Sequence, residues 1–147
     1  QRQMCIRDSP YCPVLRELAV STGRAQNLTV HESGTVVVIQ GPRFSTRAES
    51  RWFAAQGWEV VNMTQYPEVI LARELELCYV NIALITDFDA GLAGDPDVEP
   101  VTVAQVERVF ATNNERVRDL ILALVPQIPA ERTCPCATAM GGAFIGG

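Results

Sequence analysis

Short runs of β-branched residues alternate along the chain with stretches of helical periodicity, and this alternation constrains the fold more than any other feature. Three apolar runs predict buried strands: "GTVVVIQG" (34–41), "WEVVNM" (58–63) and "CYVNIALIT" (78–86). Strands that are joined through helices pair in parallel. The sequence therefore predicts an α/β fold, a layered domain whose central mixed or parallel sheet is flanked by helices.

Four helices are predicted from the residues that begin and end them. Proline suits the first helical position, glycine suits the position after the last, and a hydroxyl residue three positions before an acid or amide forms a capping box. The signals are Pro13 and Gly23 for the first helix, Thr46, Glu49 and Gly57 for the second, Pro67 for the third, and Thr102 with Gln105 for the fourth.

Charge and hydropathy exclude several classes of partner. The 12 basic residues are all arginine, and 17 acidic residues give a formal net charge of −5. Because basic clusters are absent from the sequence, nucleic acid and acidic membrane surfaces are not expected partners. The sequence has no run of about 18 apolar residues and begins without the apolar core of a signal peptide, so a cytoplasmic location is expected.

The cysteines show no metal-binding pattern along the sequence. They are Cys5, Cys12, Cys78, Cys134 and Cys136, and the single histidine, His31, lies far from them in sequence. Pairs of ligands at short, regular spacing are typical of zinc sites, and no such pairing is present. The sequence therefore predicts neither a metal site nor a disulfide framework.

The ends of the chain differ in character from its middle. Residues 1–9, "QRQMCIRDS", match the translation of a transposon-type sequencing adapter, and we interpret them as foreign to the natural protein. Residues 10–128 are expected to form part of a single domain. Residues 129–147 are interpreted as a tail, in which "CPCATAMGGAFIGG" (134–147) is small and uncharged.

Chemically capable side chains follow each predicted strand. Phe44 follows the first strand, Met63 and Thr64 follow the second, and Asp87 and Asp89 follow the third. Loops at the carboxyl ends of parallel strands share one rim and form ligand pockets there. An aromatic face, a thioether, a hydroxyl and two carboxylates suit a nucleoside.

Other interpretations of the two acids remain open at this point. An aspartate directly after a strand often caps a turn or a helix. Asp-x-Asp after a strand is also typical of aspartate-based phosphatases, but that motif is followed by glycine and a hydroxyl residue, whereas Ala90 and Gly91 follow here.

Taken together, "GPRFSTRAES", "NMTQYPEVILARE" and "ITDFD" resemble the methylthioadenosine phosphorylase branch of the trimeric purine nucleoside phosphorylases, over residues 10–128. The resemblance implies a C-terminal part of one nucleoside phosphorylase domain. It also implies a homotrimer that cleaves the glycosidic bond of a nucleoside with inorganic phosphate, without a metal or an organic cofactor.

The resemblance also implies roles for individual residues. Phe44, Ser45 and Thr86 are expected at the purine, Met63 at the ribose, Thr64 at phosphate, and Val103 and Val106 at the methylthio group, with Asp87 and Asp89 as the catalytic acids. A proton held at the five-membered ring of the departing purine stabilises it. Asp87 can supply that proton if burial disfavours its anion.

Substrate class is predicted from two of these positions. Relatives that prefer 6-oxopurines carry Glu and Asn where this chain has Ser45 and Asp87, and a carboxylate attracts the amine of a 6-aminopurine but repels a carbonyl oxygen. S-methyl-5'-thioadenosine is thus the expected substrate. Phe88 stands where tyrosine is common, which leaves the shape of the sugar pocket open.

Two alternatives accompany that prediction. One is a purine nucleoside phosphorylase of broader or 6-oxopurine specificity, and the other is a truncated nucleoside-binding module without activity. The family's glycine-rich phosphate loop is not found in the chain, so the chain alone is expected to be inactive.

Overall fold

The computed structural model describes residues 9–89 and 103–141, and these residues form two compact units. Unit 1 takes its described residues from 9–32, 65–82 and 120–141. Unit 2 takes its described residues from 33–64, 83–89 and 103–119. Each unit thus combines segments that lie far apart in the sequence.

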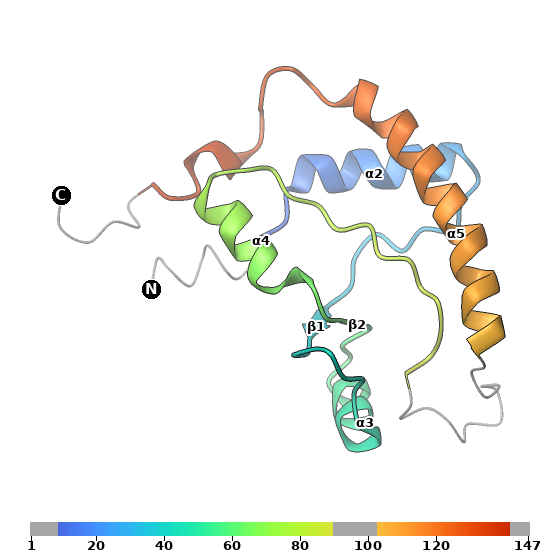
Figure 1. Ribbon diagram of the computed structural model, residues 1–147. Helices are drawn as coiled ribbons and strands as arrows, with labels where there is room; N and C mark the ends of the chain where they lie inside the picture. Colours follow the sequence, from blue (N-terminus) through green and yellow to red (C-terminus); the bar gives the residue numbers. More distant parts are fainter. Residues whose placement is uncertain (1–8, 90–102, 142–147) are drawn as a thin grey trace. The chain divides into compact units, whose positions relative to one another are not determined.

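Unit 2 contains a parallel pair of strands, β1 (Val36–Val38) and β2 (Val60–Asn62). The register pairs Val36 with Val60 and Val38 with Asn62. Helix α3 (Arg47–Ala55) connects the strands, and Figure 1 shows β1 and β2 side by side with α3 next to them. The predicted parallel pairing through a helix is therefore confirmed for the first two strands.

Both predicted end signals of α3 are confirmed. The Thr46 side chain accepts a hydrogen bond from the Glu49 N–H, and the Glu49 carboxylate accepts one from the Thr46 N–H at 2.7 Å, which completes a capping box. Beyond the helix, Gly57 adopts φ +71°, a conformation that suits a residue without a Cβ. The start and the stop of α3 are thus set by local chemistry.

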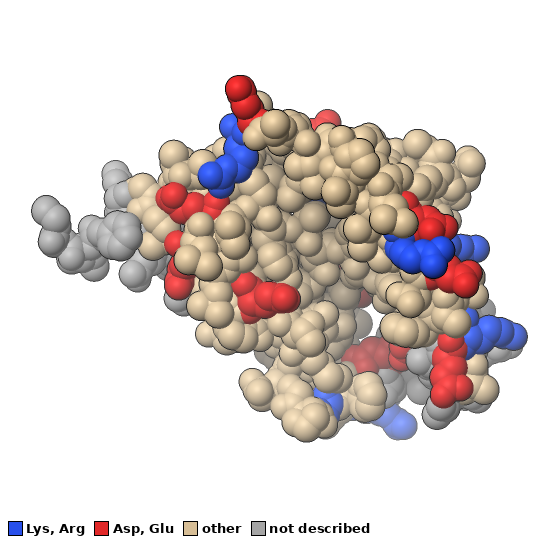
Figure 2. All heavy atoms as spheres, turned by 45° about the horizontal axis from the view of Figure 1, so that its top comes forward, with Lys and Arg blue, Asp and Glu red and all other residues tan. Residues whose placement is uncertain are grey.

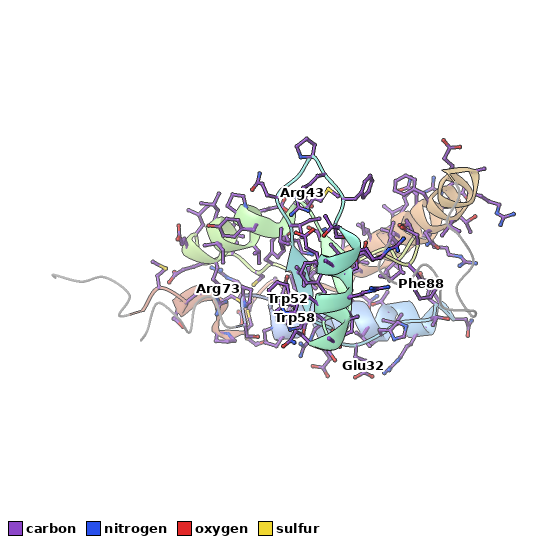
Figure 3. All side chains as sticks on the ribbon, turned by 90° about the horizontal axis from the view of Figure 1, so that it is seen from below. Glu32, Arg43, Trp52, Trp58, Arg73 and Phe88 are labelled. Atoms are coloured by element: carbon purple, nitrogen blue, oxygen red, sulfur yellow. The ribbon has the colours of Figure 1, made fainter. Side chains whose placement is uncertain are left out.

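Aromatic packing holds the end of α3 in place. The ring centroid of Trp52 lies 5.6 Å from that of Phe53 and 5.6 Å from that of Trp58. Phe53 is buried, and Trp52 and Trp58 lie next to each other in Figure 3. These rings bring the helix and the approach to β2 together.

Unit 1 is helical. It contains α2 (Pro13–Ala25), α4 (Gln65–Glu74) and the end of α5 (Val103–Leu124), followed by the short 3-10 helices η2 (Val125–Gln127) and η3 (Pro135–Thr138). Its buried apolar residues are Cys12, Ala19, Val69, Leu120, Leu124 and Cys136. Leu120 and Leu124 lie near the end of α5, so this part of the helix contributes buried side chains to unit 1.

The predicted role of Gly23 as a helix stop is wrong. Helix α2 continues through Gly23 to Ala25, and Asn27, with φ 58°, takes the left-handed position beyond it. A Cβ on Gly23 would lie 2.8 Å from Cγ2 of Val30, closer than such atoms approach in proteins. Gly23 is therefore required for close packing of the following chain against the helix.

Helix α4 begins as the sequence predicts. Tyr66 has an extended conformation (φ −104°, ψ 128°), so the regular helical turns start at Pro67. A proline at the first helical position loses no hydrogen bond, because the N–H groups of the first turn have no partner within the helix.

The third predicted strand is not formed in the described part of the chain. Residues 78–86 have no regular secondary structure, and the described sheet consists of β1 and β2 alone. An apolar, β-branched run becomes a strand only where a neighbouring backbone pairs with it. The predicted cap of α5 at Thr102 lies outside the described residues, although α5 begins at Val103 as expected.

No described helix has the length and hydropathy that a membrane crossing requires. Figure 2 shows acidic and basic side chains interspersed on the face that it presents, with uncharged surface between them. This face therefore offers no continuous basic patch.

Candidate functional site

The residues predicted for the site all belong to unit 2, and the loops that follow β1 and β2 meet at one edge of the strand pair. A Cβ placed on Gly41, after β1, would lie 3.5 Å from Sδ of Met63, after β2. Phe44, Ser45, Met63 and Thr64 thus come from two neighbouring loops, as the parallel arrangement predicts.

The third predicted loop is attached to the first through Asp89. The Ser45 hydroxyl lies 2.5 Å and 2.7 Å from the two Asp89 carboxylate oxygens, and the Ser50 hydroxyl donates to Asp89 Oδ2 at 2.5 Å. These serines lie 44 and 39 residues from Asp89 along the chain. Asp89 is therefore a long-range anchor between this segment and the start of α3.

Asp87 lies two residues before this anchor and is exposed. The Thr86 hydroxyl donates a hydrogen bond to Asp87 Oδ1. The expected burial of Asp87 is therefore not found among the described residues, because the end of an unpaired apolar segment does not enclose its side chain. Any exclusion of water from this carboxylate has to come from groups other than the described residues.

Two phenylalanines of this region are also open to solvent. The side chain of Phe44 is 84% exposed and that of Phe88 is 61% exposed. Large aromatic side chains contribute most when a partner covers them. The same loops therefore present apolar rings and a carboxylate, which is the combination predicted for a purine.

Thr64 is held by the last residue of β2. Asn62 Oδ1 accepts from the Thr64 N–H at 2.7 Å and from the Thr64 hydroxyl at 3.3 Å. The exposed Thr64 hydroxyl is thus already oriented at the loop. To donate to a phosphate oxygen, it has to turn away from Asn62, since a hydroxyl has one hydrogen to give.

Ser45 and Ser50 differ in how well the sequence indicated them. Ser45 was predicted to contact substrate, but its side chain is buried and directed to Asp89, so substrate contact stays a prediction. Ser50 was not predicted at all. Its position in the first turn of α3, five residues after Ser45, is the available signal, because a helix N-terminus favours a carboxylate beside it.

Arg43 and Glu49 form the strongest charged pair of this region. Arg43 Nη1 and Nη2 lie 2.8 Å and 2.7 Å from the two Glu49 carboxylate oxygens. The Arg43 hydrogen bond, followed by those from Thr46, lowers the pKa of Glu49 to about 2. Figure 3 shows Arg43 on the loop that leads into α3, so the pair joins this loop to the helix.

Helix α5 contacts the segment that carries the acids. Asn113 Nδ2 donates to the Ile85 carbonyl oxygen at 3.2 Å. Val103 and Val106, predicted at the methylthio group, lie in the first turn of α5, but their side chains fall outside the described residues. The structure thus brings together the loops bearing Phe44, Met63, Thr64, Asp87 and Asp89, and leaves the two valines as a prediction.

Curated proteins that are named as nucleoside phosphorylases resemble most of this chain. An S-methyl-5'-thioadenosine phosphorylase from Thermofilum pendens is 48% identical over 136 residues, which are 92% of this chain and 50% of the relative. A Mycobacterium tuberculosis protein of the same name is 54% identical over 125 residues, 85% of this chain and 44% of the relative. A purine nucleoside phosphorylase from Streptomyces coelicolor is 50% identical over 135 residues, 90% of this chain and 47% of the relative. The chain spans about half the length of the curated relatives it matches.

Solved structures give the same result for the fold. A variant adenosine/methylthioadenosine phosphorylase from Schistosoma mansoni in complex with adenine superposes with a TM-score of 0.75 at 35% identity, covering 88% of this chain and 51% of that one. Another variant of that enzyme, in complex with methylthioadenosine, gives a TM-score of 0.72 at 35% identity, covering 84% and 46%. The α/β fold predicted from the sequence is therefore confirmed as the nucleoside phosphorylase fold.

The sequence profile of the Phosphorylase superfamily matches residues 3–126. That stretch includes every predicted site residue and both strands of unit 2. The chain therefore belongs to the phosphorylase superfamily.

Proposed function

We propose that the full-length protein, of which this chain represents about half by comparison with its relatives, catalyses the phosphorolysis of S-methyl-5'-thioadenosine. The products are adenine and 5-methylthioribose 1-phosphate. Phosphate is the co-substrate, and the proposal requires neither a metal nor an organic cofactor for the reaction.

The observation that carries this proposal is the difference in hydrogen bonding and exposure between Asp87 and Asp89. The Asp89 carboxylate accepts hydrogen bonds from two serine hydroxyls. Asp87, on the same segment, is exposed and precedes the exposed Phe88. A purine that covers Asp87 supplies the desolvation that the described residues do not. Asp89 then serves as a positioning residue, and Asp87 contacts the base.

The direction of charge flow agrees with this assignment. Breaking the glycosidic bond leaves positive charge on the sugar and negative charge on the purine. A protonated Asp87 that donates to the ring nitrogen of the purine stabilises the departing base, and its second oxygen accepts from the exocyclic amine. A 6-oxopurine lacks that amine and presents an acceptor to an acceptor.

The remaining roles are proposed by position. Phe44 covers one face of the purine, Met63 lies beneath the sugar, and the Thr64 hydroxyl donates to phosphate. Val103 and Val106 form the apolar wall for the methylthio group. We also propose a cytoplasmic homotrimer in which neighbouring subunits complete each pocket.

A second candidate is a purine nucleoside phosphorylase that accepts 6-oxopurines. The Streptomyces coelicolor relative, 50% identical, is named purine nucleoside phosphorylase. The two candidates differ in the purine group that faces Asp87. It is an amine in the first candidate and a carbonyl oxygen in the second.

The test compares kcat/KM of the full-length protein for methylthioadenosine, adenosine and inosine. We expect methylthioadenosine to be preferred. Asp87→Asn should lower kcat/KM for methylthioadenosine by about 10²-fold or more, the range for loss of a general acid, and should raise the ratio of inosine to methylthioadenosine turnover.

Asp119→Asn is the matched control, because Asp119 is an exposed aspartate that pairs with Arg118 on α5. It should leave the kinetics unchanged. A wild-type preference for inosine would support the second candidate. An unchanged kcat/KM in Asp87→Asn would show that Asp87 takes no part in the reaction.

A further inference from the structure

Four thiols converge in unit 1, although their positions in the sequence show no pattern. The Sγ atoms of Cys12, Cys78, Cys134 and Cys136 all lie within 4.8 Å of one another. They come from three segments: the residue before α2, the chain after α4, and the start of η3. The expectation of no metal site rested on sequence spacing, which does not register ligands contributed by separate segments.

Backbone contacts hold these segments together. The Cys12 N–H donates to the Tyr79 carbonyl oxygen at 2.7 Å, which brings Cys12 to the neighbour of Cys78. Two residues before Cys78 in sequence, Glu76 accepts from Arg132 at its carbonyl oxygen (2.9 Å) and from the Met140 N–H at its carboxylate (3.1 Å). Hydrogen bonds therefore join the three segments that carry the cysteines.

The burial of the thiols suits an enclosed site. Cys12 and Cys136 are fully buried, and Cys78 and Cys134 are half-buried.

The distances between the sulfurs match a mononuclear metal site. Cys78 and Cys134 have their Sγ atoms 3.4 Å apart, well beyond the 2.03–2.05 Å of a disulfide, and all four cysteines are free thiols. Tetrahedral zinc with Zn–S bonds of about 2.3 Å places its sulfurs about 3.8 Å apart. An iron–sulfur cluster needs its cysteines farther apart, because iron and sulfide ions stand between them.

We propose that Cys12, Cys78, Cys134 and Cys136 bind one zinc ion in a tetrahedral site of four thiolates. Four protein ligands leave no open position on the metal, so the site is structural. Its ligands belong to unit 1, whereas the residues proposed for phosphorolysis belong to unit 2. The zinc ion therefore stabilises unit 1 and takes no part in the reaction.

The first test measures metal content. The full-length protein, produced with zinc in the medium and purified with a reductant and without chelators, should contain one zinc ion per chain by elemental analysis. Replacing zinc with cobalt should give thiolate-to-cobalt charge-transfer absorption and the visible bands of tetrahedral cobalt.

The second test uses variants at one ligand. Cys134 is half-buried, so it has room for a different ligand. Cys134→Ala should lose the cobalt bands, and Cys134→His should keep a bound ion with shifted bands, since a Cys₃His site also binds zinc. The control Thr133→Ser changes the preceding exposed residue and should behave as wild type.

Three results would overturn the proposal. The protein could contain no metal while all four thiols react with a thiol reagent after unfolding. The cysteines could instead prove to be joined as disulfides when protein purified without reductant is unfolded. Copper bound in place of zinc by protein grown with both metals would also refute the zinc assignment. Because the wild-type measurements do not depend on any variant, a variant that fails to fold leaves the proposal testable.

Discussion

Asp89 joins the segment that carries Asp87 to the start of α3 through two serine side chains. The Asp89 carboxylate accepts hydrogen bonds from Ser45 and Ser50 at the start of α3. A carboxylate near a helix N-terminus is also favoured by the partial positive charge there. The segment that carries Asp87 is thus joined to the helix that follows the first loop.

Removing one of these hydroxyls should destabilise unit 2. We predict that Ser50→Ala lowers the free energy of unfolding of the full-length protein by about 1.5–3 kcal/mol, the range for a hydrogen bond to a charged group. The measurement is urea unfolding. Ser21→Ala is the control, because its hydroxyl is exposed and donates to the Leu18 carbonyl oxygen within α2. Equal losses in the two variants would contradict the anchoring role of Ser50.

The site residues could be predicted only in part. The sequence order of Phe44, Met63 and Asp87 after apolar runs indicated a shared rim, and the contact of the Gly41 and Met63 loops agrees with it. The partner of Asp89 could not be predicted, because a hydrogen bond across 39 or 44 residues depends on tertiary packing. The burial expected for Asp87 failed because the apolar run before it has no paired neighbour among the described residues.

At the level of elements, local signals were reliable where a short stretch determines the geometry. The capping box of α3, the stop at Gly57 and the start of α4 at Pro67 each depend on residues within a few positions of one another. Gly23 was misinterpreted because a glycine required for packing and a glycine required for a left-handed turn look the same in a sequence. The strand at 78–86 failed for lack of a pairing partner.

The α3 cap should make stability depend on pH. The pKa of Glu49 is lowered to about 2 by Arg43 and Thr46, below its ordinary value of 4.5, so the folded protein favours the carboxylate. This contribution is fully present above about pH 5 and is lost as the pH falls through about 4.5 towards 2. We predict that the urea midpoint of wild type exceeds that of Glu49→Gln near pH 6, and that the difference narrows towards pH 3.

Arg43→Gln provides the matched comparison for this prediction. It removes the largest cause of the lowered pKa and keeps the Thr46 contacts. The pH range over which the stabilising contribution of Glu49 is lost should therefore be narrower in Arg43→Gln. The loss should begin at about the same pH as in wild type and be complete at a higher pH. A difference between wild type and Glu49→Gln that stays constant from pH 6 to pH 3 would show that the cap does not titrate.

At the scale of the whole molecule, the residues proposed for the base and the sugar are present in a chain about half as long as its relatives. The family resemblance implies that most of the phosphate site lies outside it. We therefore predict that the 147-residue chain alone does not convert methylthioadenosine with phosphate, whereas the full-length protein does. The measurement is adenine release by both proteins at equal concentration, and turnover by the chain alone would contradict the prediction.

Unit 1 is assembled from the beginning, the middle and the end of the chain. During synthesis, α2 and α4 therefore leave the ribosome long before the segment that contains Leu120, Leu124 and Cys136. Until that last segment emerges, the apolar faces of the earlier helices lack the residues that cover them. The core of unit 1 can therefore be completed only after this last segment has emerged, and the apolar faces that are exposed until then favour aggregation.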